Sequence, residues 1–332
     1  MTARHSPVDL TTDNSALIYR SFGDPQQVLH LETAPLPALI PSKLRVTMIY
    51  APVNPSDLIP ITGAYAHRVH PPSVAGYEGV GLVVSAPKTH AGLVGRRVLP
   101  LRGVGTWQTV VDCDPELAVP VPDEVDDLVA ARAYINPLAA ITMLDTWPVA
   151  GKRVLLSGAG SACAELLGLW ALKQGATTVV GIYRSEERKG RLLECGIKPV
   201  QTDDTAAVAA AAAEADLTFD AIGGHVGSAI LDAMRPGTVF IAYGLLSGQP
   251  LRPSRTPRAK YELFHLRNPL ATMTSAAWQG QFRHIWPMLL KLELQPVKVF
   301  PLEHWQAAIE EAKRPGGTKP ILSFPFRYSS IN

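Results

Sequence analysis

The chain has 332 residues, of which 47% are hydrophobic and 18% are charged. This length exceeds that of a usual single domain and predicts about two domains, which create a cleft suited to a small-molecule site. The 31 Lys and Arg residues nearly balance the 29 Asp and Glu residues, and the net charge of +2 gives no reason to expect nucleic acid as a partner. Residues 1–14 lack the pattern of a signal peptide, and no run of about 18 apolar residues occurs, so we expect a cytoplasmic protein without a membrane partner.

The three cysteines, Cys113, Cys163 and Cys195, are widely spaced and odd in number. They exclude a disulfide framework and any zinc site of the CxxC type, and we expect small buried residues without chemistry. The nine histidines show no ligand spacing. We interpret His67 and His70 as loop residues, so the sequence predicts no metal site.

The first third of the chain reads as short strands separated by Pro, Gly and Asp clusters. The expected strands are residues 16–19, 44–50, 79–84, 97–101 and 107–111. This spacing is typical of a small β-barrel or sandwich. A Pro-containing segment at 121–123 is a candidate boundary, because Ala, Leu and Ile follow at helical spacing over residues 127–144.

From Lys152 onward, strands and helices alternate. The expected strands are 153–156, 178–182, 219–222, 239–243 and 270–274, and the expected helices are 164–173, 186–195 and 226–234. This alternation predicts a doubly wound parallel sheet. The alanine-rich run at 206–213 is most simply a surface helix. The final segment, 297–326, has strand-like texture around a helix at 304–312, and we expect it to pack on the first domain.

The strongest single motif joins an apolar strand to a helix through a loop of small residues. Its candidate cofactor-binding residues are Ser157, Gly158, Gly160, Ser161, Ala162 and Cys163. Small residues let the backbone approach a pyrophosphate, which the free amides and the dipole at the helix start stabilise. Ala164 replaces the third glycine of the usual pattern. A tight turn in an α/β domain remains the alternative interpretation.

The end of the next expected strand points to NADPH as the cofactor. The strand ends in Tyr183, Arg184 and Ser185, with Arg188 one helical turn further on. An NAD site would place a carboxylate at the strand end, whereas a guanidinium group and a hydroxyl suit a 2′-phosphate. We expect the adjacent pair of acids, residues 186 and 187, on the solvated face of the first helical turn.

Seven short motifs together resemble the medium-chain dehydrogenase/reductase superfamily, and within it the zinc-independent 2-enoyl thioester reductases. They are 51–57 (APVNPSD), 63–65 (GAY), 76–81 (GYEGVG), 105–107 (GTW), 136–137 (NP), 219–224 (FDAIGG) and 242–244 (AYG). The resemblance implies an α/β protein with a GroES-like catalytic domain over residues 1–122 and 295–332. A Rossmann domain for NADPH would occupy residues 123–294.

The resemblance also explains the missing metal. Zinc-dependent relatives place ligands where this sequence has Asn54, Tyr77 and Asn136. Without a Lewis acid, oxidation of an alcohol has no obvious means of stabilising an alkoxide. Reduction of an activated double bond needs no metal, because a hydrogen-bond donor can stabilise the enolate oxygen after hydride reaches the β-carbon.

The resemblance assigns roles to individual residues. Tyr65 matches the tyrosine that donates a hydrogen bond or a proton to the enolate oxygen. Asn54, Trp107 and Asn136 are expected to line the substrate pocket. Each of these four has a plain alternative as a packing or buried structural residue. Tyr243, Gly244 and Lys319 complete the expected cofactor-binding set.

The leading hypothesis is NADPH-dependent reduction of the C=C bond of an enoyl thioester, carried by coenzyme A or an acyl carrier protein, or of a similarly activated alkene. The alternatives are a quinone or enone reductase on the same scaffold and a non-catalytic NADPH-binding module. Five cations, Arg252, Arg255, Arg258, Lys260 and Arg267, form either a contact for carrier phosphates or a solvated basic loop. A homodimer through an edge strand at 270–274 is what the family implies.

Overall fold

The computed structural model describes residues 12–325, which form two compact units. Unit 1 contains the described residues up to Ile135 and those from Thr274 on, and unit 2 is Asn136–Met273. These divisions differ from the expected ones at 122/123 and 294/295. Helices α3 (Asp127–Ala130) and α10 (Ser275–Leu289) therefore belong to unit 1. Trp278 explains this for α10, because its indole N–H donates to the carbonyl oxygen of Leu117 at 2.9 Å.

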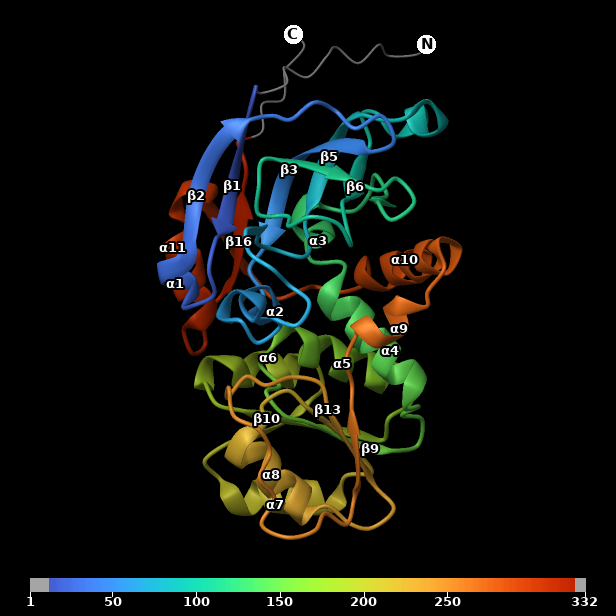
Figure 1. The fold of residues 1–332 in the computed structure, drawn as a ribbon. Helices are drawn as coiled ribbons and strands as arrows, with labels where there is room; N and C mark the ends of the chain where they lie inside the picture. The colour runs from blue at the N-terminus through green and yellow to red at the C-terminus, as the bar shows by residue number, and fades with distance from the viewer. Residues whose placement is uncertain (1–11, 326–332) are drawn as a thin grey trace. The chain divides into compact units, whose positions relative to one another are not determined.

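Unit 1 is built mainly from two sheets (Figure 1). The smaller sheet has the order β2 (Leu29–Pro35), β1 (Asp13–Tyr19), β4 (Ser73–Val74). The larger sheet has the order β15 (Val297–Pro301), β16 (Lys319–Ser323), β3 (Leu44–Pro52), β5 (Val80–Ser85), β6 (Arg97–Leu99), β8 (Val119–Pro120), with β7 (Val110–Cys113) also paired to β3. The short helical segments are α1 (Pro25–Val28), α2 (Pro55–Leu58) and the 3-10 turns η1 (Pro60–Thr62), η2 (Lys88–Leu93) and η4 (Leu302–His304).

The C-terminal segment completes this unit. Strand β16 pairs antiparallel with β3, with Ile321 opposite Pro52, and helix α11 (Trp305–Lys313) contributes Trp305, Ala308 and Ile309 to the core. The prediction that the final segment returns to the first domain is confirmed. Its expected last residue, 326, lies outside the described residues.

Unit 2 is a doubly wound parallel sheet, as predicted. Its strand order is β11 (Lys198–Gln201), β10 (Thr178–Tyr183), β9 (Arg153–Leu156), β12 (Leu217–Asp220), β13 (Val239–Ala242), β14 (Lys260–Leu263). Its helical elements are α4 (Ile135–Thr146), α5 (Ala162–Lys173), η3 (Glu186–Arg188), α6 (Lys189–Glu194), α7 (Thr205–Glu214), α8 (Gly224–Ala233) and α9 (Arg267–Ala271). Figure 1 shows α5 and α6 on one face of this sheet and α7 and α8 on the other. The alanine-rich helix α7 buries Val208 and Ala212, so one of its faces packs in the core.

Two sequence expectations about secondary structure are wrong. The strand expected at 270–274 is helix α9 followed by a turn, and the edge strand of the sheet is β14. The helix expected over 127–144 is interrupted. The backbone amides of Tyr134 and Ile135 donate to the buried Glu78 carboxylate, which fixes a new helix start at Ile135.

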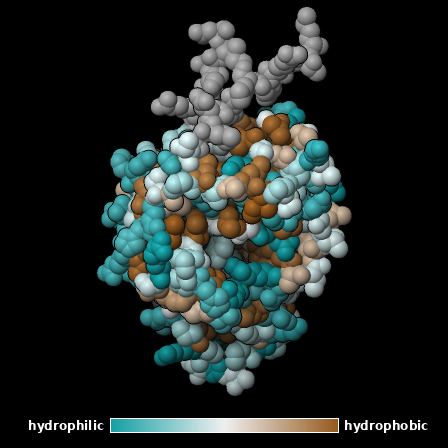
Figure 2. All heavy atoms as spheres, turned by 45° about the horizontal axis from the view of Figure 1, so that its top comes forward, coloured by the Kyte–Doolittle hydropathy of each residue, from teal (hydrophilic) through white to brown (hydrophobic). Residues whose placement is uncertain are grey.

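Several large apolar side chains are exposed at the surface of the described region, among them Leu193, Val104 and Leu263. Figure 2 shows apolar groups among hydrophilic ones on the face that it presents. None of the helices between residues 12 and 325 has both the length and the apolar character that a membrane crossing requires.

Candidate active site

In unit 2, the loop after β9 lies close to other parts of the chain. Gly158 has φ +59°, and a Cβ there would be 3.3 Å from the Leu246 side chain. A Cβ at Gly160 would approach Cγ of Arg188 to 2.8 Å. Ser161 then caps α5, with its Oγ accepting the amide of Ala164 at 3.3 Å. The loop therefore needs glycine at both positions and leads directly into a helix N-terminus, the arrangement that favours a bound phosphate.

Ser157 joins two strands through its side chain. The side chain is fully buried, and its hydroxyl donates to Oδ1 of Asp220 at 2.5 Å and accepts the amide of Ala221 at 2.9 Å. Oδ2 of Asp220 accepts the amide of Gly223 at 2.9 Å. Burial raises the pKa of Asp220. The Ser157 hydroxyl thus holds the ends of β9 and β12 together, and its predicted cofactor contact stays a prediction.

The end of β10 presents the cationic groups expected for a 2′-phosphate. Arg184 is exposed and Ser185 is partly exposed, while the stem of Arg188 packs over Gly160. The Tyr183 ring is buried, and its hydroxyl donates to Glu186 at 3.1 Å. Glu186 also pairs with Lys189 at 3.0 Å. This acid is therefore engaged by a phenol and an ammonium group next to the two arginines.

A buried hydroxyl lies at the start of α5. The Tyr243 hydroxyl has no hydrogen-bond partner in ordinary geometry, although the side chains of Cys163 and Ser161 are near enough to affect it. Burial raises its pKa well above the usual value, so it is a neutral donor. Burial also raises the pKa of Cys163 to about 12, and this thiol faces the carbonyl oxygen of Asn136 at 3.9 Å. An unpaired donor beside a helix N-terminus fits an anionic dinucleotide.

The backbone of Gly244 also lies in close contact with its surroundings. A Cβ at this position would stand 2.8 Å from the carbonyl oxygen of Ala221, and the Gly244 amide donates to the Asp220 carbonyl oxygen at 3.3 Å. The chain after β13 is therefore packed against the chain after β12. In unit 2 the structure thus brings together the glycine loop, Tyr243, Gly244 and Cys163 at the carboxyl ends of neighbouring strands, where open α/β sheets bind ligands.

In unit 1, Tyr65 lies in turns that follow η1. Gly63, with φ +87°, ends η1, and Tyr65 is partly exposed two residues later. The Arg68 guanidinium carbon stands 3.8 Å above the centre of the Tyr65 ring, and the His67 ring lies edge-on at 6.3 Å. A cation stacked on the ring restrains the phenol at the surface of this unit. Arg68 was not among the site residues predicted from the sequence, because this contact depends on the turns after η1.

Four polar side chains, Asn54, Asp57, Glu78 and Lys319, form what we call the Asn54 cluster. The Lys319 ammonium group donates to Oδ1 of Asn54 and, at 2.8 Å, to the Val53 carbonyl oxygen. Nδ2 of Asn54 donates to Glu78 at 2.7 Å. Asp57 accepts the amides of Asn54 at 2.8 Å and of Tyr77 at 3.0 Å.

Burial dominates the electrostatics of the Asn54 cluster. It raises the pKa of Asp57 to about 7 and also raises that of Glu78, because both carboxyls are withdrawn from water. It lowers the pKa of Lys319 to about 8, although the charges of Glu78 and Asp57 act in the opposite direction. Asp57 and Glu78 stood inside the motifs found in the sequence, but nothing there indicated that they contact Lys319.

The remaining predicted site residues are divided between the two units. Trp107 is completely buried in the core of unit 1, and its indole N–H donates to the carbonyl oxygen of Pro52 at 3.1 Å. Asn54, Tyr65, Trp107 and Lys319 belong to unit 1, whereas Asn136 and the other cofactor-binding candidates belong to unit 2. Within residues 12–325, His, Cys, Asp and Glu side chains form no group of three or more that could hold a metal ion.

Comparison with known proteins identifies the family. Residues 41–123 match the alcohol dehydrogenase GroES-like domain. The mitochondrial enoyl-[acyl-carrier-protein] reductase of Arabidopsis thaliana is 30% identical over 260 residues, which cover 74% of this chain and 69% of the relative. The chain therefore belongs to the medium-chain dehydrogenase/reductase superfamily and stands close to its enoyl reductases.

Solved structures agree with this assignment. A putative NADPH:quinone reductase from Bacillus thuringiensis has a TM-score of 0.87 and 32% identity, covering 94% of this chain and 99% of that one. The enoyl thioester reductase Etr1p of Candida tropicalis, solved with NADP and crotonyl-CoA, shares the fold with a TM-score of 0.81 at 19% identity, covering 94% and 100%. The fold is thus that of a GroES-like domain combined with a Rossmann-like domain, as expected.

Proposed function

We propose that this protein is an NADPH-dependent oxidoreductase that reduces the C=C bond of an α,β-unsaturated thioester without zinc. The observation that carries the proposal is Tyr65, which stands in the motif of the enoyl reductases and is held under Arg68 at the surface of unit 1. The similarity to mitochondrial enoyl reductases supports the substrate class. The NADPH named in related structures supports the cofactor.

Residues of unit 2 would hold the cofactor. The amides at Gly158–Ser161 and the N-terminus of α5 would bind the diphosphate, and the Tyr243 hydroxyl would donate a further hydrogen bond. Arg184 and Ser185 would bind the 2′-phosphate. When bound, NADPH supplies the hydride that is added to the β-carbon of the substrate.

Tyr65 would act on the other end of the double bond. Addition of a hydride to the β-carbon moves an electron pair toward the thioester oxygen. The Tyr65 hydroxyl would donate a hydrogen bond to that oxygen, where negative charge develops. A proton taken up from water at the α-carbon then completes the saturated thioester.

A quinone or enone reductase is the second candidate, and the 32% identity to a putative NADPH:quinone reductase favours it. Oxidation of NADPH, followed with enoyl-CoA thioesters of several lengths, enoyl-carrier mimics, quinones and free enones, separates the two. Faster turnover of quinones than of every thioester would replace the first proposal by the second. Binding of NADPH with no oxidation would leave a non-catalytic module.

Tyr65→Phe tests the role of the phenol. The substitution keeps the ring over which Arg68 stacks and removes only the donor, so NADPH affinity should persist. We expect single-turnover reduction to slow by roughly a hundredfold, the usual cost of losing one oxyanion donor. An unchanged rate, with hydride transfer shown to limit it, would make Tyr65 a packing residue.

Arg184→Ala tests cofactor selection. A charge-assisted contact to the 2′-phosphate is worth on the order of 1.5–3 kcal/mol, so NADPH binding should weaken while NADH binding stays nearly constant. Lys189→Ala is the control, because it removes an exposed cation nearby that already pairs with Glu186. Equal weakening of both cofactors by Arg184→Ala would contradict the assignment.

We also propose a homodimer that forms through β14. This strand lies at one edge of the sheet of unit 2. It carries Tyr261, which is 47% exposed, and Leu263, which is 62% exposed. Unpaired backbone groups at the edge of a sheet, together with these two exposed side chains, favour pairing with another strand. Leu263→Lys should shift the protein from dimer to monomer in analytical ultracentrifugation; a monomeric unmodified protein would reject the proposal.

A further inference from the structure

Lys319 lies against the turn that carries Asn54. The carbonyl oxygen of its neighbour Pro320 accepts the amide of Val53 at 3.0 Å, so the two backbones are in register. Its ammonium group then donates to the carbonyl oxygen of Val53 and to Oδ1 of Asn54. Two of the three N–H donors of this ammonium group are therefore used within unit 1.

These contacts fix the orientation of the Asn54 carboxamide. An ammonium group can only donate, so it must face Oδ1, and an ionised carboxylate can only accept, so it must face Nδ2. The 2.7 Å bond from Nδ2 to Glu78 agrees with that arrangement. Asn54 is 2% exposed. Its side chain thus links Lys319 to Glu78 and is not turned toward solvent.

A continuous series of short turns connects this cluster to Tyr65. The amide of Asp57 donates to the Asn54 carbonyl oxygen at 3.0 Å, and the amide of Ile59 donates to that of Pro55 at 3.3 Å. Three further backbone hydrogen bonds continue the series, each from an amide to a carbonyl oxygen. They join Thr62 to Ile59 at 3.2 Å, Gly63 to Pro60 at 3.1 Å and Ala66 to Gly63 at 3.0 Å. Each turn shares residues with the preceding one, so a displacement of Asn54 is transmitted to the segment that carries Tyr65.

We propose that Lys319 is a positioning residue for Tyr65 and acts through the Asn54 turn, in place of the cofactor contact that its sequence position suggested. The inference rests on the proposed function, because it needs Tyr65 as the donor. The ammonium group anchors the first turn of the series from two sides, by a backbone oxygen and by a side-chain oxygen. Loss of this anchor displaces the phenol hydroxyl from the developing oxyanion, and a misplacement near 1 Å can cost about a hundredfold in rate.

Lys319→Met removes the charge and keeps most of the length of the side chain. We expect kcat for an enoyl-CoA substrate to fall by roughly tenfold to a hundredfold. The Kd for NADP⁺, measured by calorimetry, should change by less than about twofold, because the cofactor does not depend on a positioning residue. Lys319→Arg keeps a cation and should recover part of the rate. A large rise in the Kd with unchanged kcat would overturn the inference and return Lys319 to the cofactor site.

Combining Lys319→Met with Tyr65→Phe provides the decisive readout. If Lys319 acts through Tyr65, its loss should cost less than about threefold once the phenol hydroxyl is gone. A merely structural role would reduce the rate by the same factor in both backgrounds, and that additive result would overturn the inference. Where Lys319→Met does not fold, as judged by circular dichroism, Lys319→Arg replaces it in the same cycle.

Lys313→Met is the matched control. Lys313 ends α11 in the same unit and makes only a 3.6 Å ion pair with Asp24 in the described part of the chain, with 47% of its side chain exposed. Its substitution should leave kcat and the Kd unchanged, and a loss equal to that of Lys319→Met would contradict a specific role. If the unmodified protein fails to oxidise NADPH with any thioester, the proposed function fails; additivity in an active protein overturns this inference alone.

Discussion

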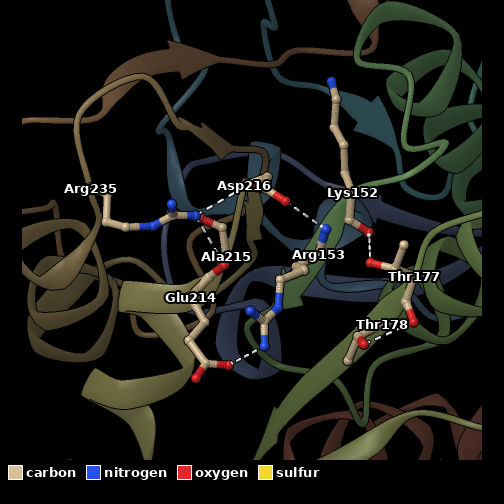
Figure 3. Close-up of polar contacts among 8 residues, drawn as sticks. All are labelled: Lys152, Arg153, Thr177, Thr178, Glu214, Ala215, Asp216 and Arg235. Atoms are coloured by element: carbon tan, nitrogen blue, oxygen red, sulfur yellow. Dashed lines mark hydrogen bonds and ion pairs between the residues drawn. The ribbon is translucent and has the colours of Figure 1, made fainter.

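Two groups of linked charged side chains, one in each unit, differ in their contact with water. In the Asn54 cluster of unit 1, Asp57 is 2% exposed and Glu78 is 1% exposed. In unit 2, Arg153, Glu214, Asp216 and Arg235 form what we call the surface network, next to the amino ends of β9 and β12 (Figure 3). Their side chains are 39–61% exposed.

The difference shows that similar ion pairs have different consequences. The Arg153–Glu214 pair at 2.5 Å and the Arg235–Asp216 pair at 3.0 Å lie in water, where solvent and salt weaken the attraction and most of the hydration is retained. The Asn54 cluster loses that hydration, and its charges are compensated by hydrogen bonds among its members and from the neighbouring backbone amides of Tyr77, Tyr134 and Ile135. Removing one member should therefore matter much more in unit 1 than in unit 2.

Glu78→Ala should give the largest loss of stability. Its carboxylate accepts three N–H groups, from Asn54, Tyr134 and Ile135, and it compensates the charge of Lys319. Breaking such a buried pair costs about 3–5 kcal/mol in free energy of unfolding, measured by urea denaturation. Glu214→Ala is the control in the surface network. Similar losses from the two substitutions would remove the distinction between the two groups.

Ser157→Ala should have an intermediate effect, because the Ser157–Asp220 contact joins the other ends of β9 and β12 and is buried. The substitution leaves one oxygen of Asp220 without its hydroxyl donor and the amide of Ala221 without an acceptor. A buried group left unsatisfied costs about 1–3 kcal/mol. Urea denaturation of this variant beside Arg153→Ala compares the two ends of the same strands, and a greater loss from Arg153→Ala would reverse the comparison.

The pH dependence of stability should carry the signature of Asp57. Its pKa is about 7 in the folded protein and 3.8 ordinarily, so between these values the folded state binds more protons than the unfolded state. The contribution of Asp57 to stability therefore falls as the pH rises from 3.8 to about 7. We expect the free energy of unfolding of the unmodified protein minus that of Asp57→Asn to fall over this range. A constant difference would mean that Asp57 titrates normally.

Lys319 should show the opposite dependence at higher pH. Its pKa is about 8 in the folded protein and 10.5 ordinarily, so the folded state binds fewer protons between these values. Its contribution to stability therefore increases as the pH rises through that interval. The free energy of unfolding of the unmodified protein minus that of Lys319→Met should therefore rise over this range. A difference that falls with pH would contradict the lowered pKa of Lys319.

The smallest effect should come from the surface network. A double-mutant cycle of Arg153→Ala and Glu214→Ala should give a coupling of about 0.2–1 kcal/mol in the free energy of unfolding. The coupling should shrink in 1 M salt, where the Debye length is about 3 Å. A coupling that persists in salt would show that the pair is shielded from solvent more than its exposure indicates.

Local sequence patterns were sufficient for much of unit 2. Periodicity and small residues indicated β9, the glycine loop and α5 because strand, turn and helix adjoin in the chain. Strand β14 escaped detection because Lys260, Tyr261 and Glu262 do not resemble a buried strand. The start of α4 escaped for a different reason: it depends on Glu78, a residue 57 positions away from Ile135.

The predicted site shows the same limit. The resemblance located Asn54, Tyr65 and Lys319, but it gave no indication that Lys319 bonds to Asn54 across 265 positions of sequence. Arg68 was equally hidden, because a cation over an aromatic ring depends on the shape of the turns after η1. Spacing in the sequence identifies residues by the motif in which they stand. Contacts between residues that are far apart in the sequence are seen only in the folded chain.

The location of β16 has a consequence for biosynthesis. This strand lies between β15 and β3 in the sheet of unit 1, yet it is the last strand of the chain in the described residues. At roughly 5–20 residues per second, a ribosome delivers Lys319 more than about ten seconds after Asn54. Unit 2, which is one continuous segment, has all its strands by then. During translation, residues Tyr50–Pro52 of β3 therefore lack their β16 partner until the end of that interval, whereas Leu44–Thr47 can already pair with β7. Nascent chains stalled before residue 319 should be the species that chaperones retain.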